Sequence, residues 1–227
     1  MQDHQFLKSC PQAKLNIPRV IALWLFPKET SLLPISENEQ AWGEELPAKR
    51  SWQYRQARGC ARAALSDLWG IPPNEIPLTA SPGEPPTLGK GFGYTSFSHC
   101  KDAVLIGWSS KPIGIDLERA DRSFPAKALS ERYFSDEEKA KIRLLEGEEL
   151  HSVVLNNWLI KEAAIKWQKS NLASGLSEWK YMPNSNYALH KSLRYKLGVN
   201  LIEHGPWRMA IGCNGLKSYY QPILCIY

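Results

Sequence analysis

The segment KPIGIDLE, residues 111–118, decides how the fold is interpreted, because it combines a strand pattern with two acidic residues. In an extended strand, successive side chains point to opposite faces of the sheet. The three apolar residues of the segment therefore share one face, and Gly114, Asp116 and Glu118 share the other. The pattern predicts a strand that presents two neighbouring carboxylates, with a glycine leaving room beside them.

A third carboxylate, Glu162, lies in the segment WLIKEA, residues 158–163. Leu155, Leu159 and Ala163 recur at helical spacing and mark a buried stripe, so the segment is predicted to be helical. An acidic residue on a mostly apolar helix needs a partner.

Two interpretations of these carboxylates are open. An isolated Asp-x-Glu pair also occurs on the solvated face of an edge strand. In the functional interpretation, Asp116, Glu118 and Glu162 share one divalent cation. Because their ligands are hard oxygens with no accompanying histidine or cysteine cluster, that ion would be magnesium rather than zinc. Magnesium keeps some of its waters and accepts phosphate as a ligand, which indicates phosphate chemistry.

The size and composition are those of a globular protein. The chain has 227 residues, enough for one large domain or two small ones. The early apolar run at residues 20–26 is too short to span a bilayer, so we expect a buried strand in a cytoplasmic protein without membrane association. The cysteines are scattered and lack metal-ligand spacing, and reduced thiols are expected at Cys10, Cys60, Cys100, Cys213 and Cys225.

The net charge of +5 favours polyanionic ligands or acidic protein surfaces. It does not choose between nucleic acid, a nucleotide cofactor and an acidic partner. Arg55, Arg58 and Arg62 recur at spacings of three and four on a predicted helix at residues 49–68. They form either a solvated basic stripe or a guanidinium face for phosphate.

The predicted elements indicate an α+β architecture. A break at residues 109–112 predicts two subdomains, residues 1–111 and 112–227. Strands are expected at residues 19–26, 94–99 and 103–108, and helices at 49–68, 126–133 and 135–145. Ser135 and Glu138 form a capping-box pattern at the start of the last of these helices. The segments at residues 207–211 and 223–227 are expected to belong to a closing antiparallel sheet.

Four motifs occur in a fixed order along the chain: FSH at 97–99, GIDLE at 114–118, RYFS at 132–135 followed by Glu138, and WLIKEA at 158–163 followed by Lys166. In this order and spacing they resemble the signature of the 4′-phosphopantetheinyl transferases. The spacing is similar to that of the single-chain, surfactin-synthetase-type branch of the family. The resemblance covers about residues 49–167.

The resemblance implies two similar α/β subdomains related by a pseudo-twofold axis, with coenzyme A in the cleft between them. It also implies a reaction in which a serine hydroxyl of an apo acyl or peptidyl carrier protein attacks the β-phosphate of coenzyme A. Adenosine 3′,5′-bisphosphate is released. The two fused subdomains make a monomer sufficient, and no nucleic acid is involved.

The resemblance also assigns roles by position. Asp116, Glu118 and Glu162 would hold Mg²⁺, and either Glu162 or a metal-bound water would be the base for the serine. The residues that would contact phosphate oxygens or other parts of coenzyme A are Arg50, Arg55, Arg58, Ser98, His99, Lys161 and Lys166. Among the arginines, Arg55 is the principal candidate for the 3′-phosphate.

Two positions depart from the family pattern. Many relatives have Gly-Lys-Pro where this chain has Gly83-Glu84-Pro85, so an acid replaces a lysine near the nucleotide. Cys100 follows His99 where serine is common.

Two other functions compete with the transferase. One is a catalytically silent module of the same fold that binds coenzyme A or carrier proteins, which Glu84 favours and the intact carboxylate set opposes. The other is a two-metal nuclease, which would require an additional carboxylate and a continuous basic groove.

Overall fold

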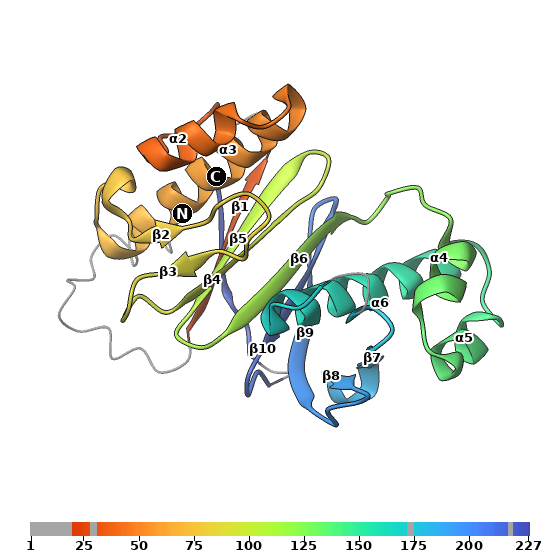
Figure 1. Cartoon of the computed structure of the whole chain (residues 1–227). Coiled ribbons are helices and arrows are strands. Elements are labelled where there is room, and N and C mark those ends of the chain that lie inside the picture. The colour runs from red at the N-terminus through yellow and green to blue at the C-terminus, as the bar shows by residue number, and fades with distance from the viewer. Residues whose placement is uncertain (1–19, 28–30, 172–174, 218–219) are drawn as a thin grey trace. The chain divides into compact units, whose positions relative to one another are not determined.

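The structure of the chain is a computed structural model that describes residues 20–27, 31–171, 175–217 and 220–227 (Figure 1). It divides into two compact units, Met1–Lys111 with Pro222–Tyr227, and Pro112–Gln221. Strands and helices occur in both units, so the predicted α+β class is confirmed.

The first unit is built on a four-stranded sheet with the order β11-β1-β5-β4. Its strands are β1 (Ile21–Pro27), β4 (Tyr94–His99), β5 (Ala103–Ser109) and β11 (Ile223–Ile226). Strand β5 pairs antiparallel with both β1 and β4. A separate two-stranded ribbon joins β2 (Leu78–Thr79) and β3 (Thr87–Leu88).

Helices α2 (Glu37–Glu44) and α3 (Ala48–Trp69) accompany this sheet among the described residues, and they lie next to each other in Figure 1. A 3₁₀ turn, η2 (Pro73–Glu75), follows them. The apolar side of α3, including Ala61 and Leu65, packs with strand residues such as Trp24 in one core. The helix ends where Gly70 adopts a left-handed conformation, which a glycine accepts without steric cost.

The C-terminal strand β11 differs from expectation in two respects. It pairs in parallel with β1, with Trp24 opposite Cys225, rather than closing an antiparallel sheet. It also belongs to the first unit, whereas the second subdomain was expected to extend to residue 227. An alternating apolar pattern predicts a strand but does not identify its partner, because any sheet edge satisfies the same backbone groups.

The second unit contains a five-stranded antiparallel sheet with the order β6-β10-β9-β8-β7. The strands are β6 (Ile113–Arg119), β7 (Trp179–Met182), β8 (Tyr187–His190), β9 (Lys196–His204) and β10 (Trp207–Cys213). The segment KPIGIDLE therefore forms an edge of this sheet, on β6.

The helices that the structure describes in full in this unit are α4 (Ala126–Tyr133), α5 (Asp136–Ile142) and α6 (Gly147–Gln168). A 3₁₀ turn, η3 (Pro183–Ser185), links β7 and β8. The predicted capping box at the start of α5 is confirmed, because Ser135 and Glu138 exchange their hydrogen bonds. Helix α6 lies along β6 and β10 and buries Leu159 and Ala163 in the core of the unit (Figure 1).

Helix α6 approaches β6 most closely at Gly114. A Cβ atom at this position would overlap the carbonyl oxygen of Ala163 and the backbone nitrogen of Trp167. Only a residue without a side chain lets the two backbones approach this closely. The two residues that follow on the same face of β6, Asp116 and Glu118, are thereby brought beside α6.

Neither membrane spans nor disulfides occur among the described residues. No described helix is long and apolar enough to cross a membrane. The described cysteines Cys60, Cys100, Cys213 and Cys225 form no disulfide with one another, and Cys10 lies outside the described residues.

We expect Gly114→Ala to lower the free energy of unfolding by about 3 kcal/mol, because the new methyl group must push helix and strand apart. Gly212→Ala is the matched control, since Gly212 lies opposite Gly114 in the β6–β10 pair. There the methyl would meet the mobile end of Leu197 at 2.8 Å. Urea unfolding of both variants tests this, and equal losses would contradict the proposed backbone contact.

Candidate functional site

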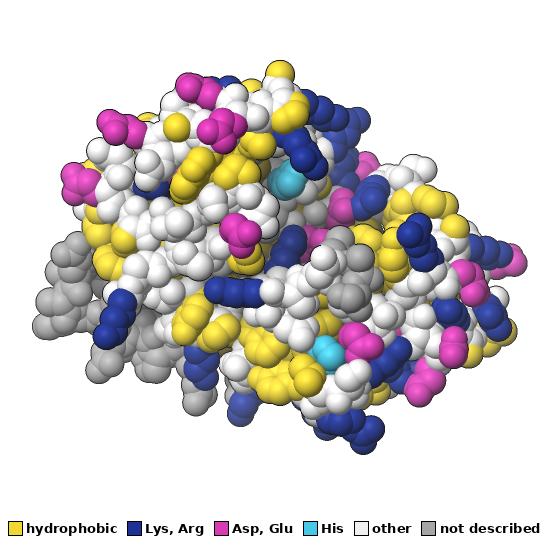
Figure 2. All heavy atoms as spheres, in the orientation of Figure 1, with side chains coloured by type: hydrophobic (Ala, Val, Ile, Leu, Met, Phe, Trp, Pro, Cys, Tyr) yellow, Lys and Arg dark blue, Asp and Glu magenta, His cyan; other side chains and the backbone are white. Residues whose placement is uncertain are grey.

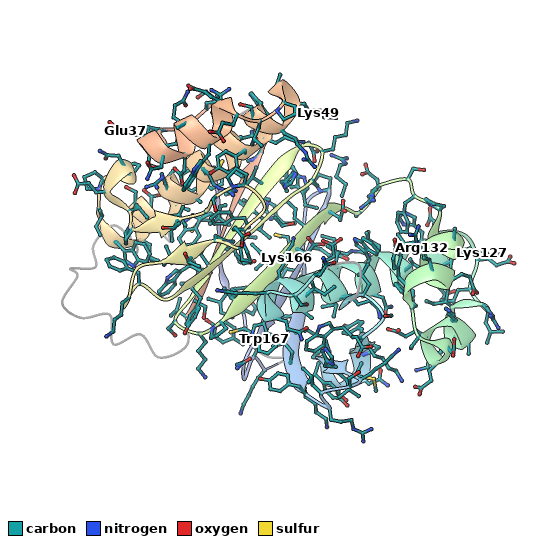
Figure 3. The ribbon with its side chains drawn as sticks, viewed as in Figure 1. Glu37, Lys49, Lys127, Arg132, Lys166 and Trp167 are labelled. Carbon is teal, nitrogen blue, oxygen red and sulfur yellow. The ribbon has the colours of Figure 1, made fainter. Side chains whose placement is uncertain are left out.

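The second unit brings four of the predicted site residues together, namely Asp116, Glu118, Glu162 and Lys166. The Lys166 Nζ donates to Asp116 Oδ1 at 2.7 Å and lies 3.9 Å from Glu162 Oε2. Asp116 comes from β6, whereas Glu162 and Lys166 stand one turn apart on α6. Figure 3 labels Lys166 and Trp167 at this end of the helix.

Glu118 completes the group on the strand side. Its side chain is 19 % exposed, and its Oε1 accepts from an Nη1 of Arg122, with which it forms an ion pair. We call Asp116, Glu118 and Glu162 the acidic cluster. Arg122 was not among the predicted site residues, although a basic residue directly after a strand with two acids is a signal that the sequence contains.

The carboxylates of the acidic cluster act on one another electrostatically. Burial, reinforced by the charges of Asp116 and Glu118, raises the pKa of Glu162 to about 8, and Lys166 and Arg122 oppose this shift. Burial also raises the pKa of Glu118, against the effect of Arg122, and the charge of Asp116 adds to the rise. Burial is thus the main cause of both shifts, and repulsion between the carboxylates adds to it.

The cluster has the donor chemistry for a hard cation but not a preformed cage. Among the residues that the structure describes, no three His, Cys, Asp or Glu side chains are arranged to hold a metal ion. Lys166 and Arg122 instead contact the carboxylates. All three side chains offer oxygen, the ligand that magnesium prefers. A bound divalent cation would also reduce the repulsion between the three carboxylates.

Trp158 stands one turn before Glu162 on α6. Its ring meets Tyr133 of α4 edge-on, with centroids 5.8 Å apart. The contact joins α4 to α6, and Trp158 packs against the core of the second unit.

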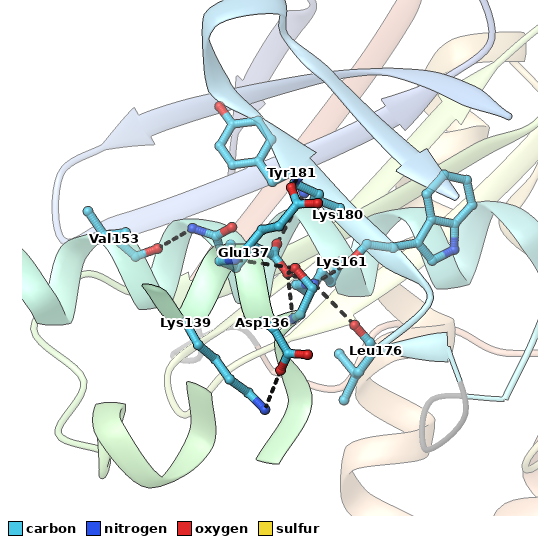
Figure 4. Close-up of polar contacts among 12 residues, drawn as sticks. Asp136, Glu137, Lys139, Val153, Lys161, Leu176, Lys180 and Tyr181 are labelled. Atoms are coloured by element: carbon cyan, nitrogen blue, oxygen red, sulfur yellow. Dashed lines mark hydrogen bonds and ion pairs between the residues drawn. The ribbon is translucent and has the colours of Figure 1, made fainter. Parts of the chain in front are cut away.

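Lys161 requires a correction. It was predicted to contact coenzyme A, but its side chain is 0 % exposed and points into the core of the second unit. Its Nζ donates to Glu138 Oε2 at 3.0 Å and to the carbonyl oxygens of Leu176 and Trp179 (Figure 4). An ammonium has three donors, and these three acceptors occupy them. The residue is therefore structural, because its ammonium is buried and its donors are engaged within the second unit.

Glu138 is the counterpart of Lys161 and joins three elements. Its Oε2 accepts from the backbone and hydroxyl of Ser135, and its Oε1 accepts from the backbone of Tyr181 at 3.3 Å. The capping residue of α5 therefore also fixes α6 and β7.

The predicted residues of the first unit lie on α3 and β4. Arg50 and His99 are exposed, Arg55 is half-buried, and Ser98 is buried on the other face of β4 from His99. His99 borders a small pocket with Gln53, Gln56, Cys100, Ala103 and Val104. Their participation in a common site with the acidic cluster remains a prediction.

The arginines of α3 do not form one uniform guanidinium face. Arg58 stacks on Tyr54 at 4.2 Å and donates from Nε to the carbonyl of Ala80, 2.9 Å away. Arg62 is buried, and its Nε forms an ion pair with Glu39 at 2.5 Å. It also donates to three backbone carbonyls, which makes it a structural residue. On the face shown in Figure 2, basic and acidic side chains are interspersed.

Comparison with known proteins finds a family model that matches most of the second unit. Residues 112–211 match the model of the 4′-phosphopantetheinyl transferase superfamily. This range contains the acidic cluster, Arg122 and Lys166.

Two named relatives extend the similarity. The chain is 26% identical over 181 residues to slr0495 of Synechocystis sp. (strain ATCC 27184 / PCC 6803 / Kazusa), provisionally named a 4′-phosphopantetheinyl transferase. That similarity covers 75% of this chain and 73% of the relative. The 4′-phosphopantetheinyl transferase HetI of Nostoc sp. (strain PCC 7120 / SAG 25.82 / UTEX 2576) is 26% identical over 119 residues, 50% of each chain. Both relatives are named as 4′-phosphopantetheinyl transferases.

Glu162 predicts a measurable pH dependence of stability in the absence of divalent cations. Its pKa rises from the ordinary value of 4.5 to about 8 on folding. As the pH rises between these values, the unfolded chain loses this proton while the folded chain retains it, so the folded state loses stability. Glu162→Gln removes this effect.

We therefore expect the stability advantage of Glu162→Gln over the wild type to grow from about pH 4.5 to 8 and then to level off. Chemical unfolding at a series of pH values, with chelator present, measures it. Parallel curves for the two proteins would contradict the burial of Glu162.

Lys161→Met should lower the free energy of unfolding by about 3–5 kcal/mol, because it leaves the Glu138 carboxylate buried without its cation. Replacing both residues, as Lys161→Met with Glu138→Gln, should restore part of this loss. Lys139→Met is the control, since Lys139 pairs at 3.7 Å with the exposed Asp136 and should cost less than about 1 kcal/mol. Similar losses for Lys161→Met and Lys139→Met would refute the buried pair.

Proposed function

We propose that the chain is a 4′-phosphopantetheinyl transferase, which moves the phosphopantetheine arm of coenzyme A to a serine of an apo carrier protein. The observation that carries the proposal is the convergence of Asp116, Glu118 and Glu162 beside Lys166, within the residues that match the family model. The by-product would be adenosine 3′,5′-bisphosphate. The spacing of the motifs favours the surfactin-synthetase-type branch.

The proposal includes Mg²⁺, which Asp116, Glu118 and Glu162 would hold. The ion would supply positive charge against the diphosphate of coenzyme A, the part of the substrate where charge develops during transfer. The mutual repulsion of the three carboxylates, which adds to the raised pKa of Glu162 and of Glu118, supports this assignment.

The chain's own residues supply the remaining requirements of the reaction. A serine hydroxyl is a weak nucleophile until a base takes its proton, and Glu162 is the candidate base once cations favour its ionised form. The Lys166 ammonium, which lies between Asp116 and Glu162, would then donate to a phosphate oxygen. Charge neutralisation and positioning are the main requirements of phosphoryl-type transfer.

We assign the nucleotide end of coenzyme A to the first unit. Arg50, Arg55 and Arg58 of α3 and His99 of β4 are the candidate phosphate contacts, with Ser98 as a neighbour. Arg58 supports this because two aromatic rings, Tyr54 and Phe97, hold its guanidinium in place. A guanidinium fixed in this way loses little entropy when it binds phosphate.

The two units would correspond to the two similar subdomains of that branch. The support is that each combines antiparallel strands with one helix of 22 residues, α3 and α6. The net charge of +5 would favour encounter with an acidic carrier surface.

One observation favours a second candidate, a silent module that binds coenzyme A or a carrier protein. Glu84, which stands where many relatives have lysine, is exposed on the segment between β2 and β3. An acid there repels phosphate, which weakens nucleotide binding.

The test is transfer itself. Incubated with coenzyme A, Mg²⁺ and an apo carrier protein, the wild type should add one phosphopantetheine group to the carrier, detected by intact-protein mass spectrometry. Asp116→Asn and Glu162→Gln should each lower the rate by about 10²–10³-fold, because each removes a charge-stabilising group. Chelation of the metal should abolish transfer.

Asp121→Asn is the matched control. Asp121 is an exposed acid that pairs with Arg119 in the segment after β6, and its loss should leave the rate unchanged. Thermal unfolding of each variant separates loss of activity from loss of fold. No mass gain with several carriers would reject the transferase and leave the binding module.

A further inference from the structure

The segment that follows β6 places a basic side chain, Arg122, beside the acidic cluster. Arg122 lies three residues beyond the end of the strand, and its guanidinium forms an ion pair with Glu118. Its charge also lowers the pKa of Glu162, so its field reaches both sides of the cluster. A metal cation that binds the Glu118 carboxylate would therefore compete with Arg122 for it.

Several contacts fix the backbone that carries Arg122. The carbonyl oxygen of Arg122 lies 2.5 Å from Nε2 of His151 on α6, and its N–H donates to the carbonyl of Arg119 at 3.2 Å. The ring of Phe124 packs against His151, with centroids 4.4 Å apart, and the Arg122 guanidinium lies 5.6 Å from the same Phe124 ring. The segment is thus pinned to the helix that carries Glu162.

Arg122 is easier to release than Lys166. Its side chain is 38 % exposed and its partner Glu118 is 19 % exposed. The Lys166 side chain is 28 % exposed, and its partner Asp116 is only 4 % exposed. An ion pair that is partly exposed to water contributes less net free energy than a buried one, because water replaces the lost partner at smaller cost. A cation that enters the cluster would therefore displace Arg122 first.

We propose that Arg122 is an internal competitor of the divalent cation, which holds Glu118 until the ion displaces it and thereby sets the ion affinity of the acidic cluster. The inference rests on the metal site of the proposed function but not on the transfer reaction. Displacement also balances charge: three carboxylates would then face one divalent ion and Lys166.

The test is calorimetric titration of the full chain with MnCl₂, since Mn²⁺ accepts the same oxygen ligands as Mg²⁺. Arg122→Gln should bind Mn²⁺ about two- to fivefold more tightly than the wild type, the factor expected for removal of a competing half-exposed ion pair. Arg122→Lys keeps the charge but not the fork of donors, and its affinity should fall between the two.

The matched control is Arg119→Gln, which makes the same charge change three residues earlier. The Arg119 guanidinium is engaged by Asp121, with hydrogen bonds of 2.6 and 2.5 Å. Its loss should leave the Mn²⁺ affinity within error of the wild type, so any general effect of net charge would appear in this variant. Asp116→Asn should remove the binding.

Three results would overturn the inference. Equal affinities of Arg122→Gln and Arg119→Gln would show that the ion pair does not compete, and weaker binding by Arg122→Gln would make Arg122 a supporting residue. Binding that survives Asp116→Asn would place the ion elsewhere. None of these results decides whether the chain transfers phosphopantetheine, which the mass-spectrometric assay measures separately.

Discussion

The close approach of helix α6 to strand β6 at Gly114 is the contact on which the acidic cluster depends. Asp116 and Glu118 are on the strand and Glu162 and Lys166 are on the helix, so no loop adjusts the distance between them. A side chain at position 114 would separate the backbones and widen the site. Rigid elements in direct backbone contact hold charged groups more accurately than loops do, and the buried apolar face of α6 supplies the free energy that keeps them there.

Electrostatic balance is the second constraint. Carboxylates that share a partly buried site repel one another, and the protein neutralises part of that charge with Lys166 and Arg122. The contrast with Glu138 and Lys161 is informative, because the same types of charge there form a closed structural pair with every ammonium donor occupied. What distinguishes a candidate site from a structural pair in this unit is therefore the excess of one sign of charge and its partial access to solvent.

The local patterns of the sequence were sufficient to predict the helices and strands, but not to predict which elements and side chains contact one another. The capping box at Ser135 and the glycine stop at Gly70 were predictable, because both depend on a few neighbouring residues. The convergence of Asp116 with Glu162 was a hypothesis that rested on motif order. The direction of Lys161 was mispredicted, because the dipeptide Lys161-Glu162 places adjacent residues about 100° apart around a helix, and only packing decides which side is buried. Arg122 was missed since its approach depends on a turn and on His151.

The origin of strand β11 bears on the order in which the chain assembles. Strand β1 is made early, but the strand that covers one of its edges is made after the entire second unit. During synthesis on the ribosome, the residues of the second unit are therefore made before β11. Until β11 is made, the backbone hydrogen-bonding groups along one edge of β1 lack their partner strand. The first unit therefore completes its sheet only after the residues of the second unit have been made.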